Sequence, residues 1–140
     1  MELQNELDMT FNYEPIYFGT IKAGEGEKLS DKCEELLSMA TEADLCLADI
    51  IQRTEGRWSR FNEKIVWDKD ICCTVQAHGM YRGDDRCKLS IEDYRNAQTF
   101  PQDYDFCGQS AAYICGMSVP PLMIKRVVNK LLEQGVFDVK

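Results

Sequence analysis

The chain has 140 residues, of which 44% are apolar, 29% charged and 10% aromatic. This composition is typical of one globular domain and excludes collagens, coiled coils and disordered proteins. The net charge is −8, and no apolar run approaches the ~20 residues that a membrane helix needs. The acidic beginning MELQNELDMT lacks the positive charge of a signal or transit peptide, so we expect a cytoplasmic protein with no membrane partner.

The negative charge belongs to one end of the chain. Residues 1–52 hold 12 acidic and 3 basic side chains, whereas the rest of the chain holds 12 acidic and 13 basic ones. There is no internal repeat and no linker rich in proline or serine. We therefore expect one compact unit with an acidic helical segment (1–52), a segment of strands (53–88) and a C-terminal segment (89–140).

The seven cysteines form no CxxC pair and are accompanied by one histidine, His78. This pattern gives no support to a metal site, and an odd number of cysteines without a secretion signal favours reduced thiols. The spacing of the cysteines therefore does not favour a metal-dependent or redox enzyme. His78 is interpreted as a loop residue, because no partner lies at a motif spacing.

In the first third, the β-branched and aromatic run 13–21 predicts a strand, which Pro15 limits to a sheet edge or a strand start. The AGEGE sequence after it predicts a turn. Ser30 then favours the start of an amphipathic helix over 31–40, and a second short helix is expected over 45–51.

In the middle third, short β-like runs predict strands over 64–67 and 71–77, followed by a polar stretch over 81–88. Thr74 and Gln76 would share one face of the second strand, where they could reach a base edge or only water.

In the last third, Ser90 predicts a helix cap and a helix over 91–98, from which a loop leads to Cys115. A final amphipathic helix is expected after the N-cap Ser118, with an apolar face of Val119, Met123, Val127 and Leu131 and a stop at Gly135. The predicted fold class is α+β, with a small mostly antiparallel sheet, flanking helices and this C-terminal amphipathic helix.

A modest basic patch lies at Arg53, Arg57 and Arg60, next to Trp58 and other aromatic residues. Its two interpretations are a solvated surface over packed rings, or a set of phosphate contacts for DNA. The overall acidity counts against nucleic acid, but the acids are concentrated elsewhere in the chain.

The most specific stretch is LSIEDYRNAQTFPQDYDF followed by YICGMSVPP and an amphipathic helix. It resembles the C-terminal end of the DNA (cytosine-5)-methyltransferases, which show LTxxExxRLQxFPxxY, then GNxVPP and a last helix. CCTVQA and CLADII resemble parts of that family's target-recognition region more weakly. The matching positions are Leu89, Ser90, Asp93, Gln98, Phe100, Pro101, Tyr104, Tyr113, Gly116, Val119, Pro120 and Pro121.

The resemblance implies roles for these blocks. The first would be a structural hinge between the recognition and catalytic lobes, made by Asp93, Gln98, Phe100, Pro101 and Tyr104. The second, with Gly116, Met117 and Ser118, would border S-adenosylmethionine, and the last helix would pack on the catalytic lobe's sheet. Segment 53–88 would be part of the recognition region. Arg53, Arg57 and Arg60 would then contact phosphates, and Thr74 and Gln76 would contact base edges.

The sequence departs from the family at several positions. Asn96 stands where the family has arginine, and Met117 stands where it has asparagine. The FxGxG cofactor turn, the Pro-Cys nucleophile and the Glu-Asn-Val motif are all missing from these 140 residues. The resemblance therefore implies no catalytic residue here, and a chain that is inactive alone.

Two hypotheses follow. The first is a split subunit or fragment of a cytosine-5 methyltransferase of the restriction–modification kind, which supports S-adenosylmethionine-dependent methylation of double-stranded DNA only beside a catalytic chain or domain. The second is a non-catalytic remnant or regulatory protein, for example phage-encoded, that acts by binding protein. Where the catalytic lobe is absent, the terminal helix would leave an apolar stripe free for self-association.

Overall fold

The computed structural model describes residues 7–136, so the ends of the predicted segments 1–52 and 89–140, at 1–6 and 137–140, lie outside the described residues. The described part contains helices and a small sheet, which confirms the predicted α+β class and its C-terminal helix. In chain order the elements are α1 (Phe18–Ile21), α2 (Asp31–Ser38), α3 (Leu47–Glu55), β1 (Lys64–Val66), β2 (Met80–Arg82), β3 (Cys87–Lys88), α4 (Ile91–Ala97), α5 (Ala111–Gly116) and α6 (Pro121–Glu133).

The sheet is mixed, with strand order β1-β2-β3. β1 pairs in parallel with β2, and β2 pairs antiparallel with β3. Single antiparallel bridges extend both edges, from Cys46 to Lys64 and from Glu27 to Lys88. The antiparallel pairing that we predicted therefore applies to one of the two strand pairs.

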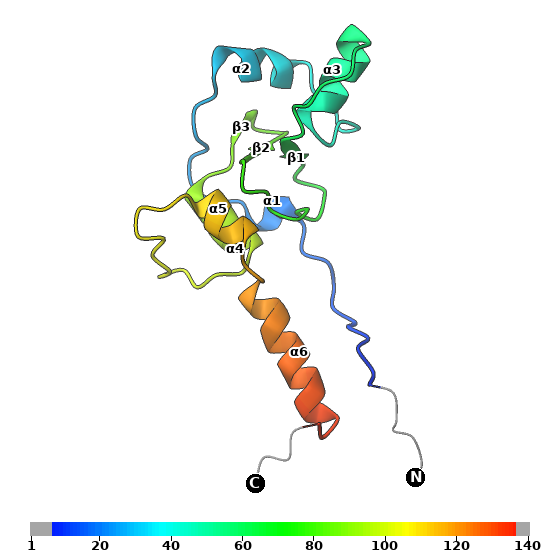
Figure 1. Ribbon diagram of the computed structural model, residues 1–140, viewed down its shortest axis with the longest axis vertical. Helices are drawn as coiled ribbons and strands as arrows, with labels where there is room; N and C mark the ends of the chain where they lie inside the picture. The colour runs from blue at the N-terminus through cyan, green and yellow to red at the C-terminus, as the bar shows by residue number, and fades with distance from the viewer. Residues whose placement is uncertain (1–6, 137–140) are drawn as a thin grey trace.

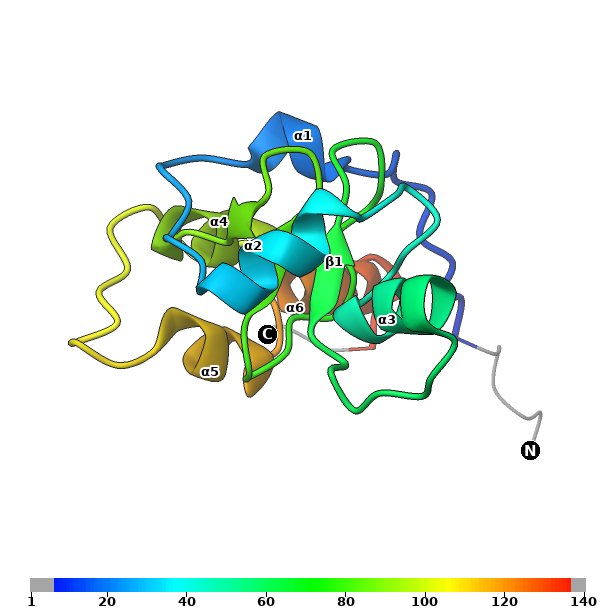
Figure 2. The same cartoon turned by 90° about the horizontal axis from the view of Figure 1, so that it is seen from above.

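Side chains that alternate across the sheet feed two apolar clusters. Ile65, Trp67 and Tyr81 face a cluster shared with α2 and α3. Val66 and Met80 face the opposite cluster, to which α1, α4 and α5 contribute. This alternation follows from the two-residue period of a strand. The body therefore has three layers, with the sheet between α2 and α3 on one side and α1, α4 and α5 on the other (Figure 1). Figure 2 looks through these layers from the side of α2 and α3.

Helix α6 lies outside these layers (Figure 1). It projects from the end of the body that carries α4 and α5, and the segment that precedes α1 runs beside it. Helices α2 and α3 lie at the other end of the molecule.

The predicted helices are present, with some shifted ends. α3 begins at Leu47 and continues to Glu55, because Cys46 and Asp49 form a capping box and Gly56 ends the helix at a φ of 68°. Ser90 caps α4 as predicted, with its hydroxyl accepting from the Asp93 N–H. The N-cap of α6 is Pro120 rather than Ser118.

Two predicted strands are wrong. In 13–21, Tyr17 makes only a single bridge, to Ile71, and Phe18–Ile21 is the helical turn α1. The N–H groups of Phe18 and Gly19 donate to carbonyls of the turn at 68–70, which satisfies the backbone without a strand partner. The run 71–77 has no ladder either, apart from that bridge at Ile71.

Two regions predicted to be irregular hold regular elements. The polar stretch 81–88 contributes to β2 and β3, because the charge of Arg82 is neutralised inside the protein. The loop before Cys115 contains α5, whose N-cap hydroxyl on Ser110 accepts from the Tyr113 N–H.

Candidate docking face and recognition surface

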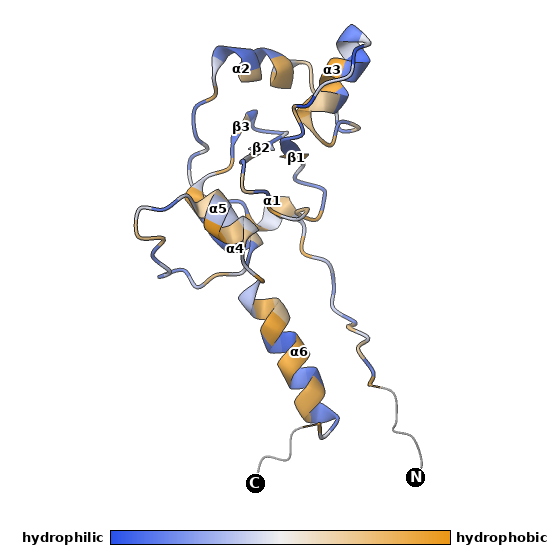
Figure 3. Cartoon of the chain, in the orientation of Figure 1, coloured by the Kyte–Doolittle hydropathy of each residue, from blue (hydrophilic) through white to orange (hydrophobic). Residues whose placement is uncertain are grey.

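Helix α6 carries an apolar face that the described part of the chain leaves uncovered. None of its 13 residues is buried among residues 7–136. Hydrophilic and hydrophobic residues alternate in bands along the helix (Figure 3). The exposed large side chains are Met123, Ile124, Val128 and Leu132. The predicted stripe is therefore present but rotated, since Val127 and Leu131 are half-buried.

The segment 7–17 holds one side of α6. Asp8 and Gln134 exchange two hydrogen bonds of 2.7 and 2.9 Å, and Lys130 pairs with the Asp8 carboxylate at 3.0 Å. The Arg126 guanidinium lies 3.8 Å from the ring centre of Tyr13. An apolar groove of about 310 Å³ remains between the segment and the helix, lined mainly by Phe11, Tyr13, Ile16, Leu122, Met123 and Val127.

The predicted hinge block lies at the base of α6. The rings of Phe100, Tyr104 and Phe106 pack together, with 4.6 Å between the centres of Phe100 and Tyr104. Gln98 and Phe106 are buried, whereas Pro101 and Tyr104 are exposed. The hydroxyl of Thr99, next to Gln98, accepts from the Leu122 N–H at 3.1 Å and thereby holds the first turn of α6.

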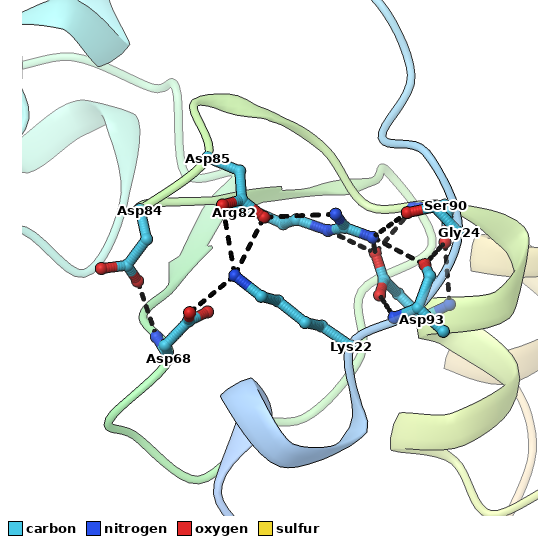
Figure 4. A network of polar contacts seen from close by, with 9 residues as sticks. Lys22, Gly24, Asp68, Arg82, Asp84, Asp85, Ser90 and Asp93 are labelled. Carbon is cyan, nitrogen blue, oxygen red and sulfur yellow. Dashed lines mark hydrogen bonds and ion pairs between the residues drawn. The ribbon is translucent and has the colours of Figure 1, made fainter.

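Asp93, the most buried member of the hinge set, lies at the centre of a polar network (Figure 4). One carboxylate oxygen accepts from the Ala23 N–H, and the other accepts from the Ser90 N–H and the Arg82 guanidinium. Arg82 also donates to the carbonyls of Ala23 and Gly24. The network therefore joins α4, β2 and the turn after α1.

Arg82 was missed by the sequence analysis, since it lies in a stretch that is polar throughout. Burial disfavours the charged guanidinium, but the hydrogen bonds and charge of Asp93 outweigh burial and raise the pKa of Arg82. The signal in the sequence that could have indicated Arg82 is Asp93 in its capping box, because a fully buried carboxylate needs a cationic partner.

The cofactor-like turn Gly116–Met117–Ser118 connects α5 to α6. A Cβ on Gly116 would lie 2.9 Å from the Ala77 backbone nitrogen, so this position requires glycine for close packing. The Ser118 hydroxyl donates to the Ile114 carbonyl, and the Met117 side chain is 71% exposed. Because the turn offers apolar contact and no free side-chain polar group, it does not fit S-adenosylmethionine on its own.

Of the predicted phosphate contacts, Arg53 has a structural partner. Its guanidinium donates to the buried Asp44 carboxylate and to the Met39 carbonyl. Burial opposes ionisation of Asp44, but Arg53 and Thr41 outweigh it and hold the Asp44 pKa below its ordinary value. Arg53 therefore anchors the end of α3.

Arg57 and Arg60 lie in an exposed loop, residues 57–62, that connects α3 to β1. Arg57 pairs with the exposed Glu55, and the Arg60 guanidinium lies 5.5 Å from the Trp58 ring. Thr74 and Gln76 lie in another irregular segment, between β1 and β2, with Thr74 exposed and Gln76 half-buried. The expectation that a strand aligns these two side chains is wrong.

A polar pocket of about 550 Å³ opens beside β2 and β3. Glu63, His78, Tyr81, Lys88 and Ser110 contribute to its lining. One carboxylate oxygen of Glu63 is buried without a hydrogen-bond partner among the described residues. The pocket holds no pairing of a nucleophile with a base that the hydrogen bonds would support.

All seven cysteines, each in the described part of the chain, are free thiols. Burial raises the pKa of Cys72 to about 12 and that of Cys115 to about 11, so both stay protonated at neutral pH. Thiolates are the nucleophilic form, and these two thiols are therefore unreactive in the folded protein. Within residues 7–136, no three acidic, histidine or cysteine side chains gather as a metal site.

No match to this chain is found among protein-family models, curated proteins or solved structures. Between residues 7 and 136, no helix has both the length and the apolar character needed to cross a membrane.

Proposed function

We propose that this chain is the DNA-recognition and C-terminal portion, as a split subunit or a fragment, of a DNA (cytosine-5)-methyltransferase. It would support methylation of cytosine in double-stranded DNA when docked on a chain or domain that carries the nucleophile and the cofactor motifs. The observation that carries the proposal is the apolar face of α6, which stands outside a body whose other elements pack in layers.

The position of this face supports docking rather than a failure to pack. The base of α6 is fixed by the Thr99 hydroxyl, and its far end is fixed to Asp8 through Lys130 and Gln134. A helix held at both ends, with a large apolar stripe left exposed, is suited to cover another surface. In the resembling family, that surface is the sheet of the catalytic lobe.

The methyl donor is assigned to the partner in this proposal. The turn at 116–118 contributes the exposed side chain of Met117 and no free side-chain polar group, so the polar contacts to S-adenosylmethionine would come from the catalytic chain. The cytosine attack would likewise use the partner's cysteine.

The proposal is tested by complementation. The chain is mixed with the catalytic portion of a cytosine-5 methyltransferase that carries FxGxG, Pro-Cys and Glu-Asn-Val but lacks its own recognition region and last helix. We expect a stable complex in sedimentation and transfer of labelled methyl groups to duplex DNA only from the mixture. Methyl transfer by the isolated chain, or no complex, would contradict the proposal.

A matched pair of variants locates the interface. Val128→Glu places a carboxylate in the apolar stripe, whereas Asn129→Glu places one on the neighbouring exposed polar position. Because an unpaired carboxylate costs several kcal/mol when it is buried, Val128→Glu should weaken the complex at least about tenfold. Asn129→Glu should bind like the unmodified chain. Self-association of the isolated chain through this stripe should respond in the same way.

The exposed Met117, in place of a polar residue, favours a second candidate function, non-catalytic binding to a protein. The two functions differ in salt dependence. Binding to DNA weakens steeply as salt rises, because phosphate contacts release counterions. Salt-tolerant binding to a methyltransferase, without DNA affinity or methyl transfer, would favour the regulatory protein.

A further inference from the structure

The loop of residues 57–62, which we name the tip loop, presents the most exposed large apolar side chain of the described residues. Trp58 is 72% exposed, and it lies between the two arginines of the loop. The other tryptophan, Trp67, is buried and donates its ring N–H to the Asp44 carbonyl at 3.0 Å. Burial of a ring this large against a partner would be favourable, so Trp58 is available for a contact that the described residues do not supply.

The exposure of Trp58 does not arise from a loose loop. Gly56 ends α3 in a left-handed conformation, with its N–H donating to the Gln52 carbonyl. Ser59 is buried, and its hydroxyl accepts from the Phe61 N–H at 3.2 Å. After the loop, the backbone carbonyl of Glu63 accepts from the Leu47 N–H, and Lys64 forms the bridge to Cys46. The backbone therefore turns Ser59 inward, while Trp58 and Arg60 stay exposed.

Cations lie beside both exposed rings of the tip loop. Arg60 lies 5.5 Å from the Trp58 ring centre, Arg57 precedes it, and Lys32 of α2 lies 4.9 Å from the ring of Phe61. The carboxylate that pairs with a loop cation is Glu55, which binds Arg57 at the surface. An exposed pair of this kind contributes little and can be replaced by a phosphate.

This chemistry fits a nucleic acid better than a protein surface. A tryptophan hot spot in a protein interface sits within a ring of apolar contacts that exclude water. Within the tip loop, Arg57, Arg60 and Asn62 are exposed polar or cationic residues. The other exposed ring, Phe61, has the Lys32 ammonium 4.9 Å from its centre. An exposed flat ring that two arginines flank in the sequence matches a base flanked by phosphates. The loop also lies at the α3 end of the molecule, away from α6 (Figure 1).

We propose that the tip loop enters a groove of duplex DNA, with Arg57 and Arg60 on the phosphates and the Trp58 ring wedged against the bases. This inference rests on the proposed function, which names DNA as the substrate. The inference assigns to Trp58 a contact with DNA bases, which neither the hinge block nor the apolar face of α6 supplies. Arg53 contributes to it only by holding the end of α3, through Asp44.

The test uses the full chain and a fluorescently labelled duplex oligonucleotide. DNA should quench the fluorescence of Trp58, and buried Trp67 should be unaffected, so Trp58→Phe should abolish most of the quenching. Trp58→Ala removes the ring and most of the apolar area, and it should weaken binding about tenfold. Trp58→Phe keeps a ring and should lose much less affinity.

The arginines have a separate readout. Replacing Arg57 or Arg60 with alanine should lower the slope of log affinity against log salt by about one for each phosphate that the variant no longer binds. Ile71→Ala serves as the control, because this exposed apolar residue lies outside the tip loop. It should leave affinity and quenching unchanged.

The outcomes separate this inference from the proposed function. If the chain binds DNA equally well with Trp58→Ala, or does not bind DNA at low salt, the inference is overturned, whereas the complementation assay still tests docking through α6. If Trp58→Ala weakens DNA binding but no complex forms with the catalytic portion, the DNA contact of Trp58 is supported and the proposed function fails.

Discussion

The buried Asp93 network predicts that Asp93→Asn will destabilise the chain strongly. Asn is nearly the same size as Asp, so the substitution changes charge and hydrogen bonding without leaving a cavity. In the native chain, one Asp93 oxygen accepts from Ser90 and from Arg82 at 2.8 Å each, and the other accepts from Ala23 at 2.9 Å. An amide has one oxygen, so its NH₂ group must face a donor.

The magnitude follows from burial. The Asp93 side chain has no exposed surface and that of Arg82 is only 7% exposed, so the variant removes the buried counterion of the guanidinium. The partly exposed Asp85 carboxylate, 3.2 Å from Arg82, remains as its other partner. Breaking a buried pair costs about 3–5 kcal/mol, and we expect the lower end, about 3 kcal/mol, because Asp85 still pairs with Arg82. A domain is stable by about 5–15 kcal/mol, and the midpoint of thermal unfolding should fall by roughly 10 °C.

The assay is urea unfolding followed by circular dichroism, with Asp103→Asn as the exposed control. Arg82→Met combined with Asp93→Asn also removes the buried guanidinium charge. The double variant should therefore lose about 0.5–3 kcal/mol less stability than the sum of the losses of the two single variants. A loss below about 1 kcal/mol for Asp93→Asn, within the range of surface substitutions, would refute the reasoning.

Three further predictions concern acid, packing and thiols. The hydrogen bonds with Arg53 lower the pKa of Asp44, so the ionised carboxylate stabilises the fold above about pH 4, and this stabilisation is lost as the pH falls through the lowered pKa. Asp44→Asn should therefore make the free energy of unfolding less dependent on pH in the acid range. An unchanged dependence would contradict this. Gly116→Ala should cost about 1–3 kcal/mol in thermal or urea unfolding, since its Cβ would press on backbone, and a neutral variant would show that the turn can shift. Alkylation near pH 7 followed by mass spectrometry should modify exposed Cys107 before Cys115, and equal rates would contradict the burial of Cys115.

Helices α2, α3, α4 and α6 could be predicted because their signals are local, whereas the short helices α1 and α5 were not predicted. The cap at Ser90, the apolar spacing of α2 and the double proline before α6 each act within a few residues. The strands could not be placed as well, because each is only two or three residues long and is defined by its neighbours. The run 71–77 has strand composition, but the described chain offers it only the bridge from Tyr17 to Ile71.

The same limit applies to the candidate site. The sequence named Arg53, Arg57 and Arg60 as equivalent cations, and only the fold shows that Arg53 binds the buried Asp44 while the other two remain at the tip. The importance of Arg82 depends on a contact with Asp93, which lies 11 positions away in the sequence, and no periodic pattern reports such a pair.

The exposure of α6 couples docking to the stability of one end of the molecule. A helix of 13 residues is marginal in water when nothing packs against it. Here the Thr99 hydroxyl, the ring of Tyr13 and the contacts of Asp8 with Lys130 and Gln134 supply the missing support. A partner that covers the apolar stripe would bind the helical form and stabilise it by mass action. Segment 7–17 and α6 therefore behave as one unit, and removal of the segment's support should weaken docking without any change in the stripe itself.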